Sequence, residues 1–164
     1  MDDTATPAPQ ADAPAPETPP RSCFDVEAVR FSGERDAAAA VRNDAWLKDL
    51  VIAAEARGTP DPKRVRRALL ARSVMLTEGM APDAWGAARA AAEALGVTRP
   101  LELYQAAGAE NAGIHLVDAP VLMEIRGRLL SLLDDEATTC IFGHELGHWL
   151  AHGPTSPDGP LGIV

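Results

Sequence analysis

His144-Glu145-Leu146-Gly147-His148 is the stretch of the chain on which the prediction of its fold rests. Residues four apart share one face of an α-helix, so the imidazoles of His144 and His148 can bind one metal ion and leave room for a third ligand and a water. Glu145 is rotated by about 100° from His144, so its carboxylate can reach that water without binding the metal. Zinc lowers the pKa of such a water, and a carboxylate accepts its proton. The pattern predicts Zn2+ held by His144 and His148, with Glu145 as the catalytic general base.

Sequence signals on both sides indicate that this stretch lies within one helix. Asp134-Asp135-Glu136 supplies acidic residues suited to a helix start, and Gly153-Pro154 is suited to its end. One face of this helix should pack into the core, and its apolar residues are Phe142, Leu146, Trp149 and Leu150. The alternative is that two surface histidines lie one turn apart beside a solvated glutamate by chance.

Three further residues of metal-binding types need an interpretation. His152 lies about 12 Å along the helix axis from His144, too far to share a tetrahedral ion, and is interpreted as a helix-end histidine near the negative end of the dipole. His148 and His152 could instead bind an ion as a pair, but the residue that follows His148 is Trp149 rather than the glutamate that the motif requires. Cys140, one turn before His144, is interpreted as a packing residue, with a role as ligand as the alternative. His115 is interpreted as structural or exposed on a strand.

Upstream of these residues the pattern is first helical. Residues 33–58 are alanine-rich with leucines at helical spacing and predict one amphipathic helix. A second helix is expected from Asp61, its N-cap, to about Glu78, and a third from about Pro82 to a cap at Gly96.

Three short apolar runs then predict a small sheet: Leu101–Tyr104, Ile114–Val117 and Val121–Ile125. The predicted fold class is α+β, with N-terminal helices, a small β-sheet and then the active-site helix. Residues 1–21 are rich in proline and alanine and are expected to be a disordered leader.

Composition excludes some classes of partner. The chain has 15 Lys plus Arg against 24 Asp plus Glu, for a net charge of −9. Its one basic cluster, Lys63 to Arg67, alternates with apolar residues as on the solvated face of a helix, with a phosphate-binding patch as the alternative. Nucleic acid is therefore not an expected partner. No apolar run is long enough for a transmembrane segment or a secretory signal. Two cysteines suggest no disulfide framework, and the compartment stays open.

Residues from about Ala94 to Gly153 resemble the HtpX-like branch of the gluzincin zinc metallopeptidases, relatives of the CAAX prenyl endopeptidases. The likeness lies in the order of short segments along the chain: a helix end, a first strand, a turn, the approach to the motif, and the motif itself. In this chain these are Ala94-Leu95-Gly96-Val97, Leu101-Glu102-Leu103-Tyr104, Asn111-Ala112, Leu129-Leu130 through Asp134-Asp135-Glu136, and His144 to His148. The resemblance implies a zincin-like endopeptidase with one zinc ion and a peptide or protein substrate. It also implies that Val121–Ile125 is an edge strand along which a substrate peptide could pair, with an ordinary edge strand as the alternative.

The chain departs from the family pattern after the motif. The family takes its third zinc ligand, a glutamate, from a downstream helix, whereas Trp149 to Val164 contain no glutamate and only one acid, Asp158. Residues 33–164 are therefore expected to form a partial metallopeptidase domain. The two hypotheses are a zinc-dependent endopeptidase that is incomplete in this chain and a non-catalytic metallopeptidase-like binding module.

Overall fold

A computed structural model describes residues 28, 32–47, 49, 52–53, 58, 60–154 and 156. The expected leader, residues 1–21, lies outside this part, as do Asp158 and most of the second half of the helix expected over residues 33–58. The helices and strands are, in chain order, α2 (Ser32–Asn43), α4 (Pro62–Leu70), β1 (Ser73–Leu76), α5 (Pro82–Ala94), β2 (Leu101–Ala106), β3 (Asn111–His115), β4 (Val121–Arg126), α6 (Leu129–Leu132) and α7 (Asp135–His152). Helices, a small sheet and a C-terminal helix confirm the α+β class.

The sheet has the order β1-β2-β4-β3. β2 pairs in parallel with β4, while β1 and β3 are antiparallel to their neighbours. The expectation that Val121–Ile125 is an edge strand is therefore wrong, because β4 lies between β2 and β3. All five of these residues are buried, which fits a central strand. The edge strands of this sheet are β1 and β3.

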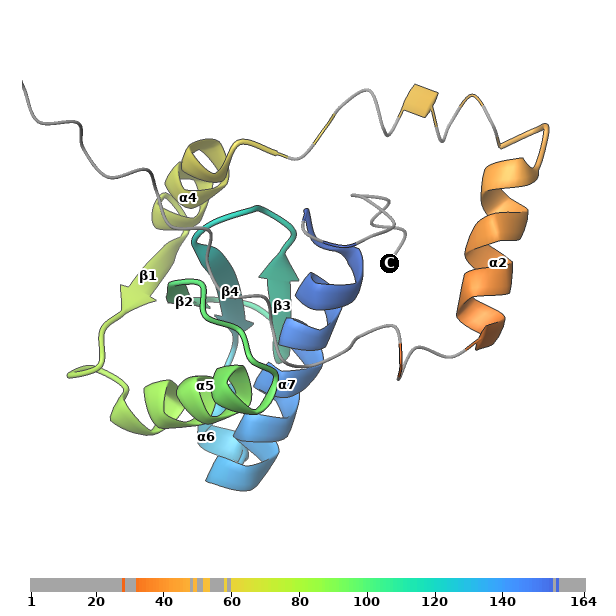
Figure 1. The fold of residues 1–164 in the computed structure, drawn as a ribbon. Helices are drawn as coiled ribbons and strands as arrows, with labels where there is room; N and C mark the ends of the chain where they lie inside the picture. The colour runs from red at the N-terminus through yellow and green to blue at the C-terminus, as the bar shows by residue number, and fades with distance from the viewer. Residues whose placement is uncertain are drawn as a thin grey trace, which may run out of the picture.

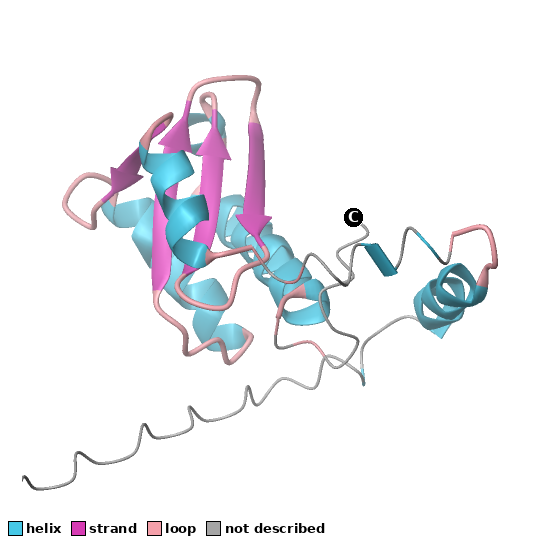
Figure 2. Cartoon of the chain, turned by 90° about the horizontal axis from the view of Figure 1, so that it is seen from above, coloured by secondary structure: helices cyan, strands magenta, loops and turns pink. Residues whose placement is uncertain are grey.

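Helices cover both faces of the sheet (Figures 1 and 2). Alternate residues of a strand point to opposite faces, and one set packs against α5 and α7 in the larger core cluster, which includes Leu103, Met123 and Phe142. The other set, Tyr104 and Leu122, packs against α4 through Leu69 in a smaller cluster. Residues 60–154 thus form a three-layer arrangement with α4 on one side of the sheet and α5 and α7 on the other.

α7 begins and ends where the sequence predicts. The Asp134 side chain accepts a hydrogen bond from the amide of Ala137 at 2.8 Å, and Gly153 follows the last turn. Phe142, Leu146 and Trp149 are buried, and the Trp149 indole donates to the carbonyl of Val117 at 2.8 Å. These contacts fix the rotation of the helix, so the opposite face, with His144, is turned outward.

Two of the predicted helices end earlier than expected. α2 stops at Asn43 because the Asp44 carboxylate accepts hydrogen bonds from the amides of Trp46 and Leu47, at 2.8 and 3.1 Å, and forms a turn. α4 starts at its predicted cap, Asp61, but ends at Leu70 rather than Glu78.

Residues 73–76 form β1 instead, since pairing with β2 satisfies their backbone groups. The third helix, α5, matches its prediction, with Gly96 after its cap at a φ of 64°.

Candidate metal centre

The two motif histidines converge on the outer face of α7. Their Nε2 atoms are 3.0 Å apart, and the rings meet edge to face with centroids 4.5 Å apart. His144 is exposed and His148 is partly buried, so a ligand can reach both rings from solvent. The spacing of four residues therefore has the geometric effect predicted from the sequence.

The separation of the two nitrogens can be compared with what zinc needs. A zinc ion with Zn–N distances of about 2.0–2.1 Å and tetrahedral angles holds two nitrogens roughly 3.3 Å apart. The observed 3.0 Å is close to this value, so a small rotation of either side chain would suit both rings as ligands. One ring donates a hydrogen bond to the other across this distance, and a bound zinc ion would take the place of that contact. His144 and His148 thus fit a zinc ion as two of its ligands.

Glu145 is available for proton transfer. Its side chain is half-buried, and within the described ranges it makes no hydrogen bond or ion pair. A carboxylate without a competing partner can accept a proton from a neighbouring water. Helical geometry rotates Glu145 by about 100° from His144, which is the placement expected of a general base beside two metal ligands.

A third ligand is not found in the part of the chain that the structure describes. No group of three His, Cys, Asp or Glu side chains there could hold a metal ion. His152, the last residue of α7, has its ring centroid 5.8 Å from that of His148, in keeping with the interpretation as a helix-end residue. Cys140 is exposed, so its interpretation as a packing residue is wrong.

Comparisons with known proteins add nothing to this geometry. No family model, curated protein or solved structure matches the chain. The resemblance to the gluzincin peptidases therefore rests on the residues themselves. Among the described helices, none combines the length and apolar character required to cross a bilayer.

A second cluster of charged side chains lies on the sheet face that α4 covers. Glu124, on the central strand and almost fully buried, contacts Arg72 at 2.6 Å, Arg126 at 3.1 Å and His115 at 3.4 Å. Burial raises the pKa of Glu124, but hydrogen bonds from Arg126 and Arg72 outweigh it and hold the pKa below its usual value. Burial also lowers the pKa of His115, against the opposing effect of Glu124.

A neighbouring pair extends this polar face. Arg66 binds the Glu102 carboxylate at 2.8 Å, and the hydroxyl of Tyr104 donates to the same carboxylate. Burial and this hydrogen bond raise the pKa of Tyr104 to about 12.

The charged cluster around Glu124 was not predicted from the sequence. One signal could have revealed it: Glu124 interrupts the apolar run of β4, and an acid at a core position needs cationic partners.

Proposed function

We propose that this chain contributes the metal-binding helix of a zinc-dependent endopeptidase, with His144 and His148 as zinc ligands and Glu145 as the general base. The observation that supports it best is the convergence of two Nε2 atoms to 3.0 Å, next in the chain to Glu145, whose carboxylate has no hydrogen-bond or ion-pair partner among the described residues. The order of helices, sheet and motif helix agrees with a zincin-like architecture. The HtpX-like resemblance implies that the third ligand is a glutamate of a downstream helix.

The chain's own residues have separate roles in this chemistry. When bound, zinc supplies a water of lowered pKa and polarises the scissile carbonyl. Glu145 accepts the proton of the attacking water and delivers it to the leaving amine. The buried apolar face of α7 and the hydrogen bond from Trp149 to Val117 hold the helix, and with it the two histidines, in position.

The sheet offers a place for the substrate. β3 is an edge strand, and α7 packs against it (Figure 1). An extended peptide that pairs with the free edge of β3 would lie on the sheet's border nearest the motif helix. In this proposal β3, rather than Val121–Ile125, receives the substrate backbone.

The test combines zinc content with peptide cleavage. The test uses protein that includes the downstream helix expected to supply the glutamate ligand; it should bind one zinc ion per chain by atomic absorption, and His144→Ala should lower this by tenfold or more. Glu145→Gln should keep the zinc, and its rate of cleavage of unfolded casein should fall by at least a hundredfold, because a general base accelerates such a step by about 10²–10⁴-fold. Glu136→Gln, an exposed acid in the first turn of the same helix, is the matched control. Zinc-dependent cleavage that survives Glu145→Gln would refute the mechanism.

One observation favours a second candidate, a non-catalytic metallopeptidase-like binding module. Only two metal-binding side chains converge among the residues described, and catalytic zinc sites use three protein ligands. For such a module, zinc is bound stoichiometrically but neither the wild type nor the Glu136→Gln control cleaves casein. The same two measurements therefore separate the candidates.

A further inference from the structure

A pocket lies on the opposite side of the sheet from the motif histidines. It has a volume of about 430 Å³, within the roughly 300–1,000 Å³ of small-molecule sites. Its lining includes Arg64, Val65, Ala68, Leu69 and Arg72 of α4 and the turn after it, and His115 of β3. The α4 residues recur at helical spacing, so one stripe of the helix forms a wall of the pocket.

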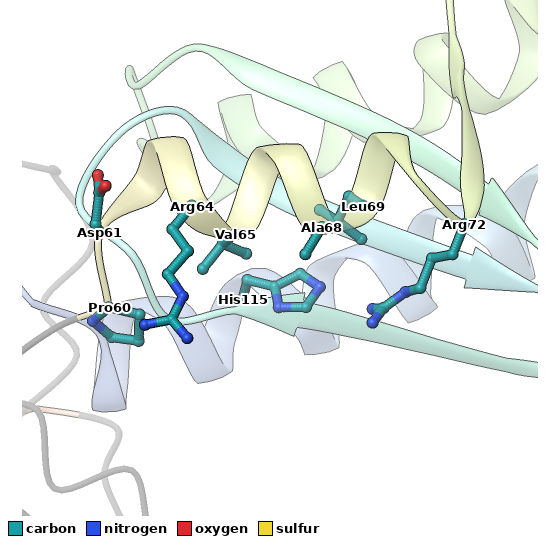
Figure 3. Close-up of a pocket in the computed structure, with 8 residues that line it drawn as sticks. All are labelled: Pro60, Asp61, Arg64, Val65, Ala68, Leu69, Arg72 and His115. Atoms are coloured by element: carbon teal, nitrogen blue, oxygen red, sulfur yellow. The ribbon is translucent and has the colours of Figure 1, made fainter.

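The pocket has an apolar centre between cationic ends. Figure 3 shows Arg64 and Arg72 at opposite ends, with the His115 ring between them and the side chains of Val65 and Leu69 above it. An ion alone would leave the apolar wall unused. A ligand with both a charged group and an aliphatic body would use both kinds of surface.

The two arginines differ in their availability. Arg72 is occupied, because its guanidinium binds Glu124 at 2.6 Å. Arg64 is exposed and, among the residues described, its guanidinium makes no hydrogen bond or ion pair. Its guanidinium can therefore bind an anion without first losing a partner.

The charges around the pocket favour an anion. Three guanidinium groups, of Arg64, Arg72 and Arg126, stand against two carboxylates, of Asp61 and Glu124, which gives a net charge of +1 with His115 neutral. Asp61 caps α4 by accepting from the amide of Lys63 at 3.0 Å. In Figure 3 its carboxylate points the opposite way from the Arg64 guanidinium. The whole chain is acidic, so a net positive pocket is a local feature.

We infer that this pocket binds a small aliphatic carboxylate, whose carboxylate pairs with Arg64 and whose hydrocarbon body lies on Val65 and Ala68 with its end at His115. A guanidinium matches a carboxylate with two parallel hydrogen bonds. The inference does not depend on the proposed peptidase function, because the motif histidines project from α7 on the other side of the sheet.

The test uses hexanoate as the probe and the ring signals of His115 in NMR spectra as the readout. The His115 signals are assigned with His115→Gln, and zinc is removed beforehand so that the carboxylate cannot report on the motif histidines. Hexanoate should shift the His115 signals saturably, with a dissociation constant on the order of millimolar. Inorganic phosphate and 1-hexanol, which keep only the charge or only the hydrocarbon, should bind at least tenfold more weakly.

Two variants and one control complete the experiment. Arg64→Gln should weaken hexanoate binding about tenfold or more, because a charge-assisted contact is lost. Arg67→Gln removes the same charge from α4 outside the pocket and should change binding by less than twofold. Ala68→Glu, an exposed position in the pocket wall, should abolish binding without affecting folding. The inference is overturned if hexanoate produces no saturable shift, if phosphate binds as tightly, or if the Arg64 and Arg67 variants lose equal affinity.

Discussion

Glu124→Gln tests whether the charged cluster beneath α4 stabilises the fold. The substitution preserves the shape of the side chain but removes the charge that Arg72, Arg126 and His115 surround. Breaking a buried ion pair costs about 3–5 kcal/mol when the remaining charge stays buried. Here the side chains of Arg72 and Arg126 are 50% and 45% exposed, so water can solvate them after the change. We therefore expect a smaller loss, about 1.5–3 kcal/mol, typical of hydrogen bonds to charged groups.

The assay is urea unfolding followed by circular dichroism at pH 7. The midpoint should fall at an unchanged slope, whereas Glu110→Gln, an exposed acid 3.9 Å from Arg128, should change stability by less than about 0.5 kcal/mol. Because the pKa of Glu124 is lowered in the folded state, its contribution is present above the unfolded value of 4.5 and is lost as pH falls through the folded value. The gap between wild type and variant should close at low pH. Equal effects of the two substitutions at pH 7 would refute the reasoning.

Three further predictions concern stability. The pKa of His115 is lowered from 6.5 by folding, so the unfolded state binds more protons and the free energy of unfolding should fall as pH drops below 6.5. His115→Asn should reduce this dependence on pH, measured as urea midpoints at several pH values, and an unchanged dependence would contradict the assignment. Gly153→Ala should destabilise by about 1–3 kcal/mol in thermal unfolding, because a Cβ there would lie 2.2 Å from the carbonyl oxygen of Trp149. Asp134→Ala should lower the free energy of unfolding by about 1 kcal/mol because it removes the cap of α7. The helical circular dichroism signal should then be lost at a lower temperature than in the wild type, and an identical melting curve would contradict this prediction.

Features fixed by neighbouring residues were predictable from the sequence. α7 has an acidic cap and a glycine directly beside its eighteen residues and an apolar stripe within them, and all three act locally. The approach of His144 and His148 follows from helical geometry alone, so this half of the candidate site could be predicted as well.

Features that depend on distant partners were not predictable. β1 is a four-residue strand whose reason to form is its pairing with β2, about thirty residues later. The central position of β4 depends on the strand order, which no local pattern of Val121–Ile125 specifies. Similarly, the pocket joins a stripe of α4 to His115, and only the tertiary fold brings these residues together.

The two sides of β3 connect the proposed substrate edge and the proposed carboxylate pocket. Ile114 packs into the core beneath α7, while the next residue, His115, lines the pocket on the other side of the sheet. A peptide paired with the edge of β3 and a carboxylate in the pocket would both contact this five-residue strand. Thermodynamic linkage then requires reciprocity: the factor by which hexanoate changes the affinity for a peptide must equal the factor by which the peptide changes the affinity for hexanoate.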